Sequence, residues 1–142
     1  MFTVEKSATI NASIDKVWEY LTKTELQGEW RDIERAEEVT DGPFSVGTQV
    51  RIVQKFMGRE MDMTYEVTEI EEPTRLAGKT DAGPLDARFE YKLRSENGST
   101  HLTITGEGEA GGLFKVAEGL FSNNLEKQLE EDLNRLKDVA GS

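Results

Sequence analysis

The chain has 142 residues, of which 36% are hydrophobic and 32% charged, a composition typical of one globular domain and unlike that of a disordered, collagenous or membrane-spanning protein. Its 17 basic and 28 acidic side chains give a formal charge of −11, which disfavours nucleic acid and anionic lipid surfaces as partners. The absence of cysteine excludes disulfides, thiolate nucleophiles and thiolate metal ligands.

The N-terminal segment has no targeting or membrane-spanning pattern. Residues 1–10 alternate polar and apolar side chains and include Glu5 and Lys6, so they lack the long apolar run of a signal peptide or a transmembrane helix. We therefore expect a cytoplasmic location and no stable membrane association. The same alternation predicts a strand over residues 3–10.

Two short helices are predicted after this strand. Ser13 stands where a helix N-cap is expected, because apolar residues recur at helical spacing directly after it. Thr24 is a second candidate cap, for a helix of a turn or two that ends near Gly28, with Trp30 just beyond it. The apolar residues of the first helix are Ile14, Val17, Trp18 and Leu21.

From residue 33 to residue 107 the apolar period changes to two. Along residues 87–95, for example, alanine, phenylalanine, tyrosine and leucine alternate with charged side chains. Such alternation indicates strands with one buried and one solvent-exposed face, as in an antiparallel sheet. Turn-forming pairs such as Asn97-Gly98 separate consecutive strands and predict a meander. The seven expected strands are residues 3–10, 33–39, 48–56, 61–70, 75–80, 87–95 and 99–107.

Residues 113–139 return to helical spacing and predict one long amphipathic helix at the C-terminus. Glu130, Glu131 and Lys137 are among the charged residues on its polar side. The apolar stripe consists of Phe114, Ala117, Phe121, Leu125, Leu129, Leu133 and Leu136.

The relative widths of these elements predict a cavity. A helix is about 10–12 Å thick, whereas seven strands spaced about 4.8 Å apart span about 30 Å, so one helix cannot cover the apolar face of the sheet. At about 1.5 Å per residue the helix extends roughly 40 Å, and we expect it to lie across the whole sheet. The sheet must therefore curve around the helix, with the short helices closing one end, and the enclosed space need not be filled.

Several segments resemble one family. They are Ser13 with Val17-Trp18 and Tyr20-Leu21, then Trp30, the stretch DGPFSVGTQVR at residues 41–51 and the stretch EEDLNRLKD at residues 130–138. Together they resemble the polyketide cyclase/dehydrase and lipid-transport family. This family belongs to the START-related (SRPBCC) superfamily, which includes the birch-pollen allergens and has the helix-grip fold. The resemblance covers essentially the whole chain.

The resemblance implies a single helix-grip ligand-binding domain over residues 1–142. Its expected fold class is α+β: a curved seven-stranded antiparallel sheet wrapped around a long C-terminal helix, with two short helices after strand 1. It also implies a cavity between sheet and helix that admits lipids, sterols, hormones or polyketides. Because family members include enzymes, ligand carriers or sensors, and chaperone regulators, the fold does not choose a chemistry.

A glycine motif near the last strand is not expected to bind a nucleotide. Gly106, Gly108 and Gly111 read G-x-G-x-x-G after a predicted strand and before a helix. However, no strand follows the helix to complete a βαβ unit, and glutamates occupy positions where a pyrophosphate would sit. We expect these glycines, with Gly112, to let the chain turn sharply from the strand into the helix. No cofactor is expected.

No catalytic residue or metal site is assigned from the sequence. His101 is the single histidine, and its parity on the predicted strand places it on the solvent-exposed face, which argues against a Ser-His-acid triad. One imidazole without cysteine does not make a closed zinc site, and the paired acidic residues lack calcium-loop spacing. Any catalysis would use Gln54, Tyr65 and Tyr91 on the buried face to orient a substrate and polarise a carbonyl.

The leading hypothesis is binding or transport of a small hydrophobic ligand, which would be lipid-, sterol- or polyketide-like, in the internal cavity. The first alternative is a cyclase, aromatase or dehydratase that acts on a polyketide-like substrate in the same cavity. The second is a protein-interaction or chaperone-regulator module whose interior is packed solid. Ligand identity and oligomeric state stay open. The expected ligand-binding residues are Trp30, Val50, Ile52, Gln54, Phe56, Met61, Met63, Tyr65, Phe89, Tyr91, Phe114, Ala117 and Phe121.

Overall fold

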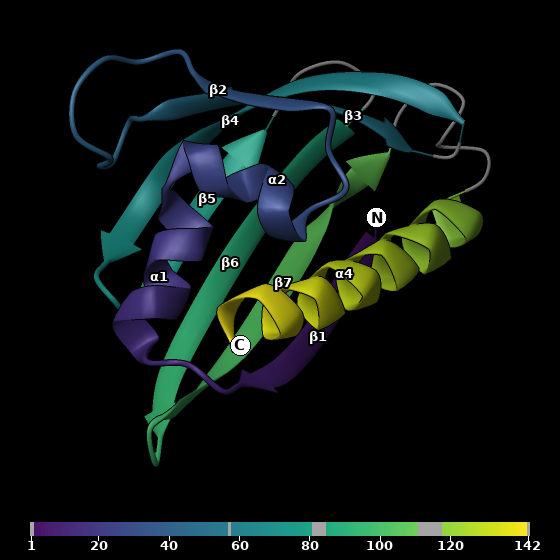
Figure 1. Cartoon of the computed structure of the whole chain (residues 1–142). Coiled ribbons are helices and arrows are strands. Elements are labelled where there is room, and N and C mark those ends of the chain that lie inside the picture. The colour runs from purple at the N-terminus through teal and green to yellow at the C-terminus, as the bar shows by residue number, and fades with distance from the viewer. Residues whose placement is uncertain (1, 57, 81–84, 111–117, 142) are drawn as a thin grey trace.

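The protein is an α+β structure in which a curved antiparallel sheet carries helices on its concave face (Figure 1). The computed structural model describes residues 2–56, 58–80, 85–110 and 118–141. The predicted helix-grip fold class is confirmed, with short helices after the first strand and a long helix near the C-terminus. Among the helices in the described ranges, none is long and apolar enough to cross a bilayer.

The sheet has seven strands in the order β1-β7-β6-β5-β4-β3-β2, and all neighbours are antiparallel. From β2 to β7 each strand pairs with the next one along the chain, as the predicted meander requires. The first strand, β1, lies at one edge of the sheet and pairs with the last strand, β7. Most strands differ from their predicted bounds by a few residues at one or both ends. The strands are β1 (Phe2–Ile10), β2 (Arg35–Glu38), β3 (Gln49–Phe56), β4 (Arg59–Glu71), β5 (Arg75–Thr80), β6 (Leu85–Glu96) and β7 (Ser99–Ala110).

The register brings the predicted apolar positions of neighbouring strands to the same face. Leu76 on β5 pairs with Tyr91 on β6, which in turn pairs with Ile104 on β7. The next inward pair along these strands is Leu93 with Leu102. All four aliphatic side chains are buried in the core. The alternation in the sequence therefore predicted correctly which side chains of these strands face the interior.

The hairpin between β6 and β7 has the predicted two-residue turn. β6 ends at Glu96 and β7 begins at Ser99, so Asn97 and Gly98 alone connect them. Their φ angles are +50° and +87°, which is the left-handed region that a tight hairpin requires at both positions. Asparagine and glycine are the residues that adopt this region at least cost.

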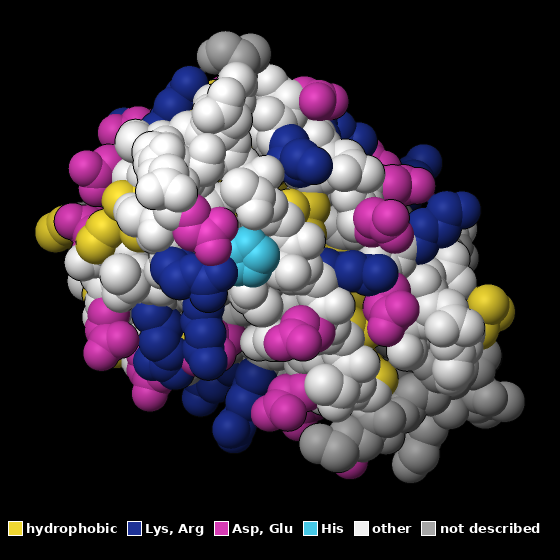
Figure 2. Space-filling model, turned by 90° about the horizontal axis from the view of Figure 1, so that it is seen from below, with side chains coloured by type: hydrophobic (Ala, Val, Ile, Leu, Met, Phe, Trp, Pro, Cys, Tyr) yellow, Lys and Arg dark blue, Asp and Glu magenta, His cyan; other side chains and the backbone are white. Residues whose placement is uncertain are grey.

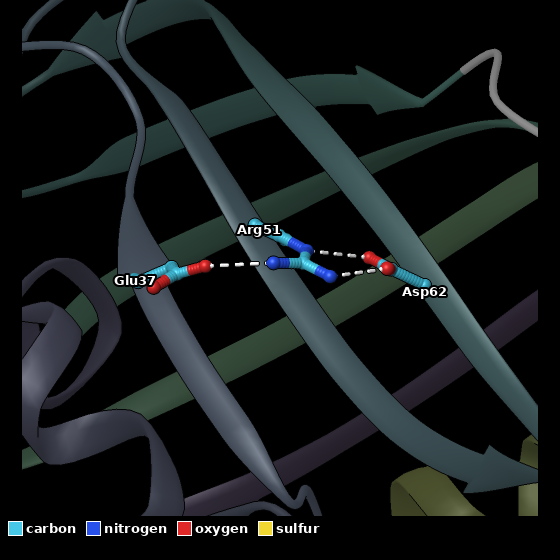
Figure 3. Close-up of polar contacts among 3 residues, drawn as sticks. All are labelled: Glu37, Arg51 and Asp62. Carbon is cyan, nitrogen blue, oxygen red and sulfur yellow. Dashed lines mark hydrogen bonds and ion pairs between the residues drawn. The ribbon is translucent and has the colours of Figure 1, made fainter.

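The convex face of the sheet is charged. Arg51 on β3 donates from Nε to Asp62 Oδ1 on β4 at 2.8 Å and from Nη1 to Glu37 Oε1 on β2 at 3.0 Å (Figure 3). A second donation, from Nη2 to Asp62 Oδ2 at 2.5 Å, makes the contact with Asp62 bidentate. Side chains of both signs also cover the face shown in Figure 2, with small hydrophobic areas between them.

The first helix follows the sequence prediction. α1 (Ile14–Thr22) begins after Ser13, whose hydroxyl accepts a hydrogen bond from the Lys16 amide at 3.2 Å. The predicted N-cap is therefore confirmed, since this contact satisfies one of the free amides of the first helical turn.

The second helix differs from its prediction. A short 3-10 helix, η1 (Thr24–Leu26), leads directly into α2 (Gln27–Trp30), so Gly28 lies inside α2 and does not end it. The expectation that Thr24 is an N-cap was wrong, because its hydroxyl donates instead to Glu38 Oε1 of β2 at 3.3 Å. The side chain thus links η1 to the edge strand of the sheet.

α1 and α2 close one end of the concave face with two tryptophans. Trp18 and Trp30 are 5% and 1% exposed. Trp30 Nε1 donates to the Tyr20 carbonyl at 3.0 Å, and Trp18 Nε1 donates to Glu72 Oε1 at 2.9 Å. Both indoles therefore have the hydrogen-bond partner that burial requires.

α4 (Glu118–Ala140) is the long C-terminal helix, and residues 113–117 of its predicted range lie outside the described residues. The expectation that it lies across the whole sheet was wrong. It packs mainly against β1 and against α2 (Figure 1). Lys6 of β1 forms an ion pair with Glu130 at 3.8 Å. α1 and α2 cover another part of the concave face, in the place where the short helices were expected to close one end.

The glycine motif also lies differently from its prediction. Gly106 and Gly108 are residues of β7, which continues to Ala110, and so they do not form a turn into the helix. Gly111 and Gly112 lie outside the described residues. The strand continues because both glycines have regular partners on β6, Phe89 and Ala87.

Candidate functional site

A cavity of about 170 Å³ lies between the concave face of the sheet and α4. Its walls come from β1 and from β3 to β7, and Leu125 and Leu129 of α4 close it from the helical side. Arg31, which directly follows α2, contributes to the wall as well.

Seven of the expected ligand-binding residues line this cavity. They come from three strands, and they include both tyrosines and the glutamine that were singled out as polar groups. The seven are Ile52, Gln54, Met61, Met63, Tyr65, Phe89 and Tyr91.

The structure places the other expected residues elsewhere or does not describe them. Trp30 and Val50 do not line the cavity: Trp30 is held in the core by its hydrogen bond to Tyr20, and Val50 is a fully buried residue of β3. Phe114 and Ala117 lie outside the described residues, as do the side chains of Phe56 and Phe121.

Several lining residues were missed as site residues although a sequence signal existed for most of them. Phe2 and Val4 follow the period of two along the first strand, and Leu125 and Leu129 belong to the predicted helical stripe. Arg31 had no such signal, because it stands in an irregular segment between α2 and β2 where neither period applies.

The cavity exists because small residues occupy the sheet beneath it. Phe89 on β6 has a glycine on each neighbouring strand, Gly78 on β5 and Gly106 on β7. The next inward pair along the sheet is Ala87 with Gly108. Side chains this small leave space above the sheet, whereas the tryptophans of α1 and α2 fill the opposite end of the concave face.

Three aromatic rings form one wall of the cavity. Tyr65 and Phe89 meet edge to face, with ring centroids 5.3 Å apart and planes at 88°, and Phe89 and Tyr91 are 5.2 Å apart with planes at 44°. Aromatic pairs favour such offset geometries because the positive edge of one ring meets the negative face of the other. The rings are thus held in a fixed arrangement.

Tyr65 and Tyr91 bring two phenol groups to the lining of the cavity. Neither oxygen has a hydrogen bond to another described residue, yet no described side-chain nitrogen or oxygen is sealed from solvent without a partner. Burial of the rings raises the pKa of both phenols, and the Arg31 guanidinium opposes this shift. Both groups therefore keep their protons near neutral pH and can donate hydrogen bonds into the cavity.

Two contacts from α4 hold the segment that carries Arg31. Arg135 Nη1 donates to the Trp30 carbonyl at 3.3 Å, and the Asp132 carboxylate accepts a hydrogen bond from the Asp32 amide. Asp132 is only 5% exposed, and burial raises its pKa. The backbone on both sides of Arg31 is therefore fixed to the helix.

The described residues contain no group of three or more histidine, aspartate or glutamate side chains that could hold a metal ion. His101 lies on the convex face of β7, where its Nδ1 is 3.3 Å from Thr9 Oγ1 of β1. It therefore lies on the opposite side of the sheet from the cavity.

Comparison with protein families identifies one match over nearly the whole chain. The model of the family described as polyketide cyclase / dehydrase and lipid transport matches residues 1–141. No protein with curated annotation matches the sequence.

Solved structures with the same architecture include three of particular interest. The START superfamily protein from Mycobacterium smegmatis has a TM-score of 0.84 at 16% identity, over 99% of this chain and 97% of that one. TTHA0849 from Thermus thermophilus has a TM-score of 0.76 at 20% identity, over 97% and 99%. The di-domain ARO/CYC protein BexL, of the BE-7585A biosynthetic pathway, has a TM-score of 0.77 at 13% identity, over 97% and 46%. At these identities the similarity establishes the fold.

Proposed function

Because the chain belongs to the polyketide cyclase/dehydrase and lipid transport family, we propose that it binds or transports a small hydrophobic ligand in the cavity between the sheet and α4. The observation that carries this proposal is the cavity itself, about 170 Å³ with walls that are mainly aliphatic and aromatic. A concave apolar site with a few polar groups is the usual form of a small-molecule site.

The size of the cavity is adequate for a ligand. An engineered protein cavity of about 150 Å³ with aliphatic and aromatic walls stays dry and binds benzene. A space of about 170 Å³ therefore accepts at least a ring or a short alkyl chain. Met61 and Met63 can widen it, because the unbranched methionine side chain adapts to the shape of its neighbours.

The proposed contacts divide into apolar and polar groups. Ile52, Phe89 and the two methionines would surround the apolar part of the ligand. Gln54, Tyr65 and Tyr91 would orient it through hydrogen bonds.

A cyclase, aromatase or dehydratase activity in the same cavity is the second candidate. Gln54, Tyr65 and Tyr91 line a single cavity, and a phenol that keeps its proton can donate a hydrogen bond to a carbonyl and polarise it. Turnover of a polyketide-like substrate that is lost in Tyr65→Phe and Tyr91→Phe would support this candidate. A module for protein interaction with a solid interior is disfavoured, since the cavity is the feature that such a module lacks.

Binding of N-phenyl-1-naphthylamine, a neutral apolar fluorophore, tests the proposed function. We expect a saturable rise in its fluorescence with the wild-type protein, and loss of that rise in Met63→Trp, because the indole would occupy the cavity. Thr103→Trp is the matched control, since Thr103 lies on the convex face of β7, in register with Lys92. Absence of saturable binding by the wild-type protein would contradict the proposal.

A further inference from the structure

Arg31 brings a positive charge to the wall of a cavity whose other walls are mainly apolar. We propose that the ligand is an amphipathic anion, a carboxylate with an apolar tail, whose charged end is bound by Arg31 and by the hydroxyls of Tyr65 and Tyr91. This inference rests on the proposed function and adds to it the chemical class of the ligand and its orientation.

The Arg31 guanidinium has donors to spare. Its Nη1 donates to Gln27 Oε1 at 3.4 Å, and its central carbon lies 5.9 Å from the centre of the Trp30 ring. Among the described residues no carboxylate lies within ion-pair distance of Arg31, and its Nε and Nη2 have no hydrogen-bond partner. Two adjacent free donors of a guanidinium match the two oxygens of a carboxylate.

The acidic side chains near Arg31, among the residues that the structure describes, have other partners. The nearest buried acid is Asp132, whose carboxylate is shared with Arg135 at 3.9 Å and with the Asp32 amide. The charges of Arg31 and Arg135 both act on Asp132, but Arg135 is the guanidinium within ion-pair distance of this carboxylate. Glu38, whose charge also acts on Tyr65, is exposed and accepts a hydrogen bond from Thr24.

The second arginine of the cavity wall does not compete for this role. Arg88 borders the cavity together with Glu107, and the two pair directly across β6 and β7. Opposite charges on directly paired residues offset each other. Arg31 is thus the lining cation without an acidic neighbour in register or at ion-pair distance among the described residues.

The two phenols complete the site. Tyr65 and Tyr91 line the same cavity as Arg31, and neither hydroxyl has a hydrogen bond to another described residue. Because α4 fixes the backbone on both sides of Arg31, little ordering is needed when an anion binds. The apolar tail would then extend along the aliphatic wall towards Leu125 and Leu129.

Competition between two ligands of equal chain length tests the inference. Decanoate and 1-decanol are each titrated against N-phenyl-1-naphthylamine bound to the full chain near pH 8, where decanoate is ionised. We expect decanoate to compete about tenfold or more better than decanol, as a charge-assisted contact allows. This order is the reverse of the order of hydrophobicity, so burial alone does not produce it.

Variants at position 31 test whether Arg31 causes the preference for decanoate over decanol. Arg31→Gln should bind decanol as the wild-type protein does and lose the preference for decanoate, whereas Arg31→Lys should keep part of it. Arg35→Gln is the matched control, because Arg35 is an exposed residue of β2 outside the cavity and its loss removes the same charge.

Each outcome distinguishes the two proposals. Equal competition by decanoate and decanol would overturn the inference and leave the proposed function standing, whereas failure of the neutral fluorophore to bind would overturn both. An Arg31→Gln protein that loses affinity for both ligands alike would also overturn it, because Arg31 would then act on the shape of the cavity. The wild-type comparison needs no variant and decides the question if Arg31→Gln does not fold.

Discussion

Gly78 and Phe89 pair across β5 and β6, and the phenylalanine ring lies over the glycine so closely that a Cβ atom there would be 2.5 Å from ring carbons Cε1 and Cζ. The same Cβ atom would be 2.9 Å from the Glu66 carbonyl oxygen on β4. The glycine thus makes room for a ring that forms part of the cavity wall.

We expect Gly78→Ala to destabilise the protein and to weaken binding in the cavity. The new methyl group must displace the Phe89 ring, and the backbone oxygen on its other side cannot move away. Insertion of a methyl group into a packed site typically costs about 1–3 kcal/mol. Urea denaturation would measure the free energy of unfolding, and N-phenyl-1-naphthylamine fluorescence would measure binding.

Gly119→Ala is the control for this substitution. Gly119 lies in α4, and a Cβ atom there would have no neighbour within 4 Å. Alanine in a helix is about 0.5–1 kcal/mol more favourable than glycine, so this variant should be at least as stable as the wild-type protein. Equal stability of the Gly78 and Gly119 variants would contradict the close contact between Gly78 and Phe89.

The two ends of α4 should differ in their contribution to stability. Leu136 is 0% exposed in the core, whereas Leu120, near the start of the helix, is 56% exposed. Leu136→Ala should lower the free energy of unfolding by about 2–5 kcal/mol, because it removes buried methyl groups and leaves a void. Leu120→Ala should change it by about 0.5 kcal/mol or less.

Chemical denaturation of both leucine variants checks this prediction, and the same substitution at both positions keeps the helix propensity change equal. Similar losses of stability at Leu120 and Leu136 would mean that the two ends of the helix are buried alike. That result would be incompatible with a helix in which Leu136 is in the core and Leu120 is exposed.

The fold was largely predictable because its signals are local and periodic. Alternation along β6 and β7 indicated the inward face, Asn97-Gly98 indicated the hairpin, and Ser13 indicated the start of α1. Where the prediction failed, a contact distant in sequence decided the outcome. Threonine is a residue type that often caps helices, but the Thr24 hydroxyl donates its hydrogen bond to Glu38 of the edge strand. The spacing of the glycines in the G-x-G-x-x-G motif likewise does not reveal that Gly106 pairs with Phe89 of β6.

The site was predictable to the extent that it lies on strands. Ile52, Met63 and Tyr65 occupy inward positions of the period of two, and they line the cavity. Trp30 and Arg31 show why the rest was not. Trp30 ends the one-turn helix α2 and Arg31 follows it, and so short a helix has no period that tells which side chain enters the core and which reaches the cavity. Hydrogen bonds from α4, about a hundred residues away in sequence, decide it.

Acid should weaken the contact between Arg51 and Asp62 on the convex face. The hydrogen bonds and charge of Arg51 hold the pKa of Asp62 below its ordinary value of 3.8 although desolvation opposes this. A carboxylate with a lowered pKa in the folded state stabilises the fold above its unfolded pKa of about 3.9, and this contribution is lost as pH falls through the lower, folded value.

The free energy of unfolding, measured between about pH 5 and about pH 2, should therefore fall less in Arg51→Gln than in the wild-type protein. The difference should be modest and reduced by salt, because both side chains are substantially exposed. Lys55→Gln, on the same strand, is the control and should follow the wild-type profile. Parallel profiles for the wild-type and Arg51→Gln proteins would contradict the assigned pairing.

Asp132 should show the opposite dependence on pH. Burial raises its pKa above the ordinary value of 3.8, although the hydrogen bond from Gln128 Nε2 at 2.9 Å and the charges of Arg31 and Arg135 oppose this. The folded state therefore holds the proton more tightly than the unfolded state. In the interval between the unfolded pKa of about 3.9 and the higher folded pKa, stability falls as pH rises.

Asp132→Asn removes this titration but keeps an oxygen that can accept from Gln128 and from the Asp32 amide. The free energy of unfolding of the variant should consequently rise relative to that of the wild-type protein as pH increases from about 3 to about 7. Asp138→Asn, at an exposed position of α4, should show no such trend. A constant or narrowing difference between Asp132→Asn and wild type over this range would mean that the hydrogen bonds and charges around Asp132 outweigh burial, and it would contradict the raised pKa of this carboxyl group.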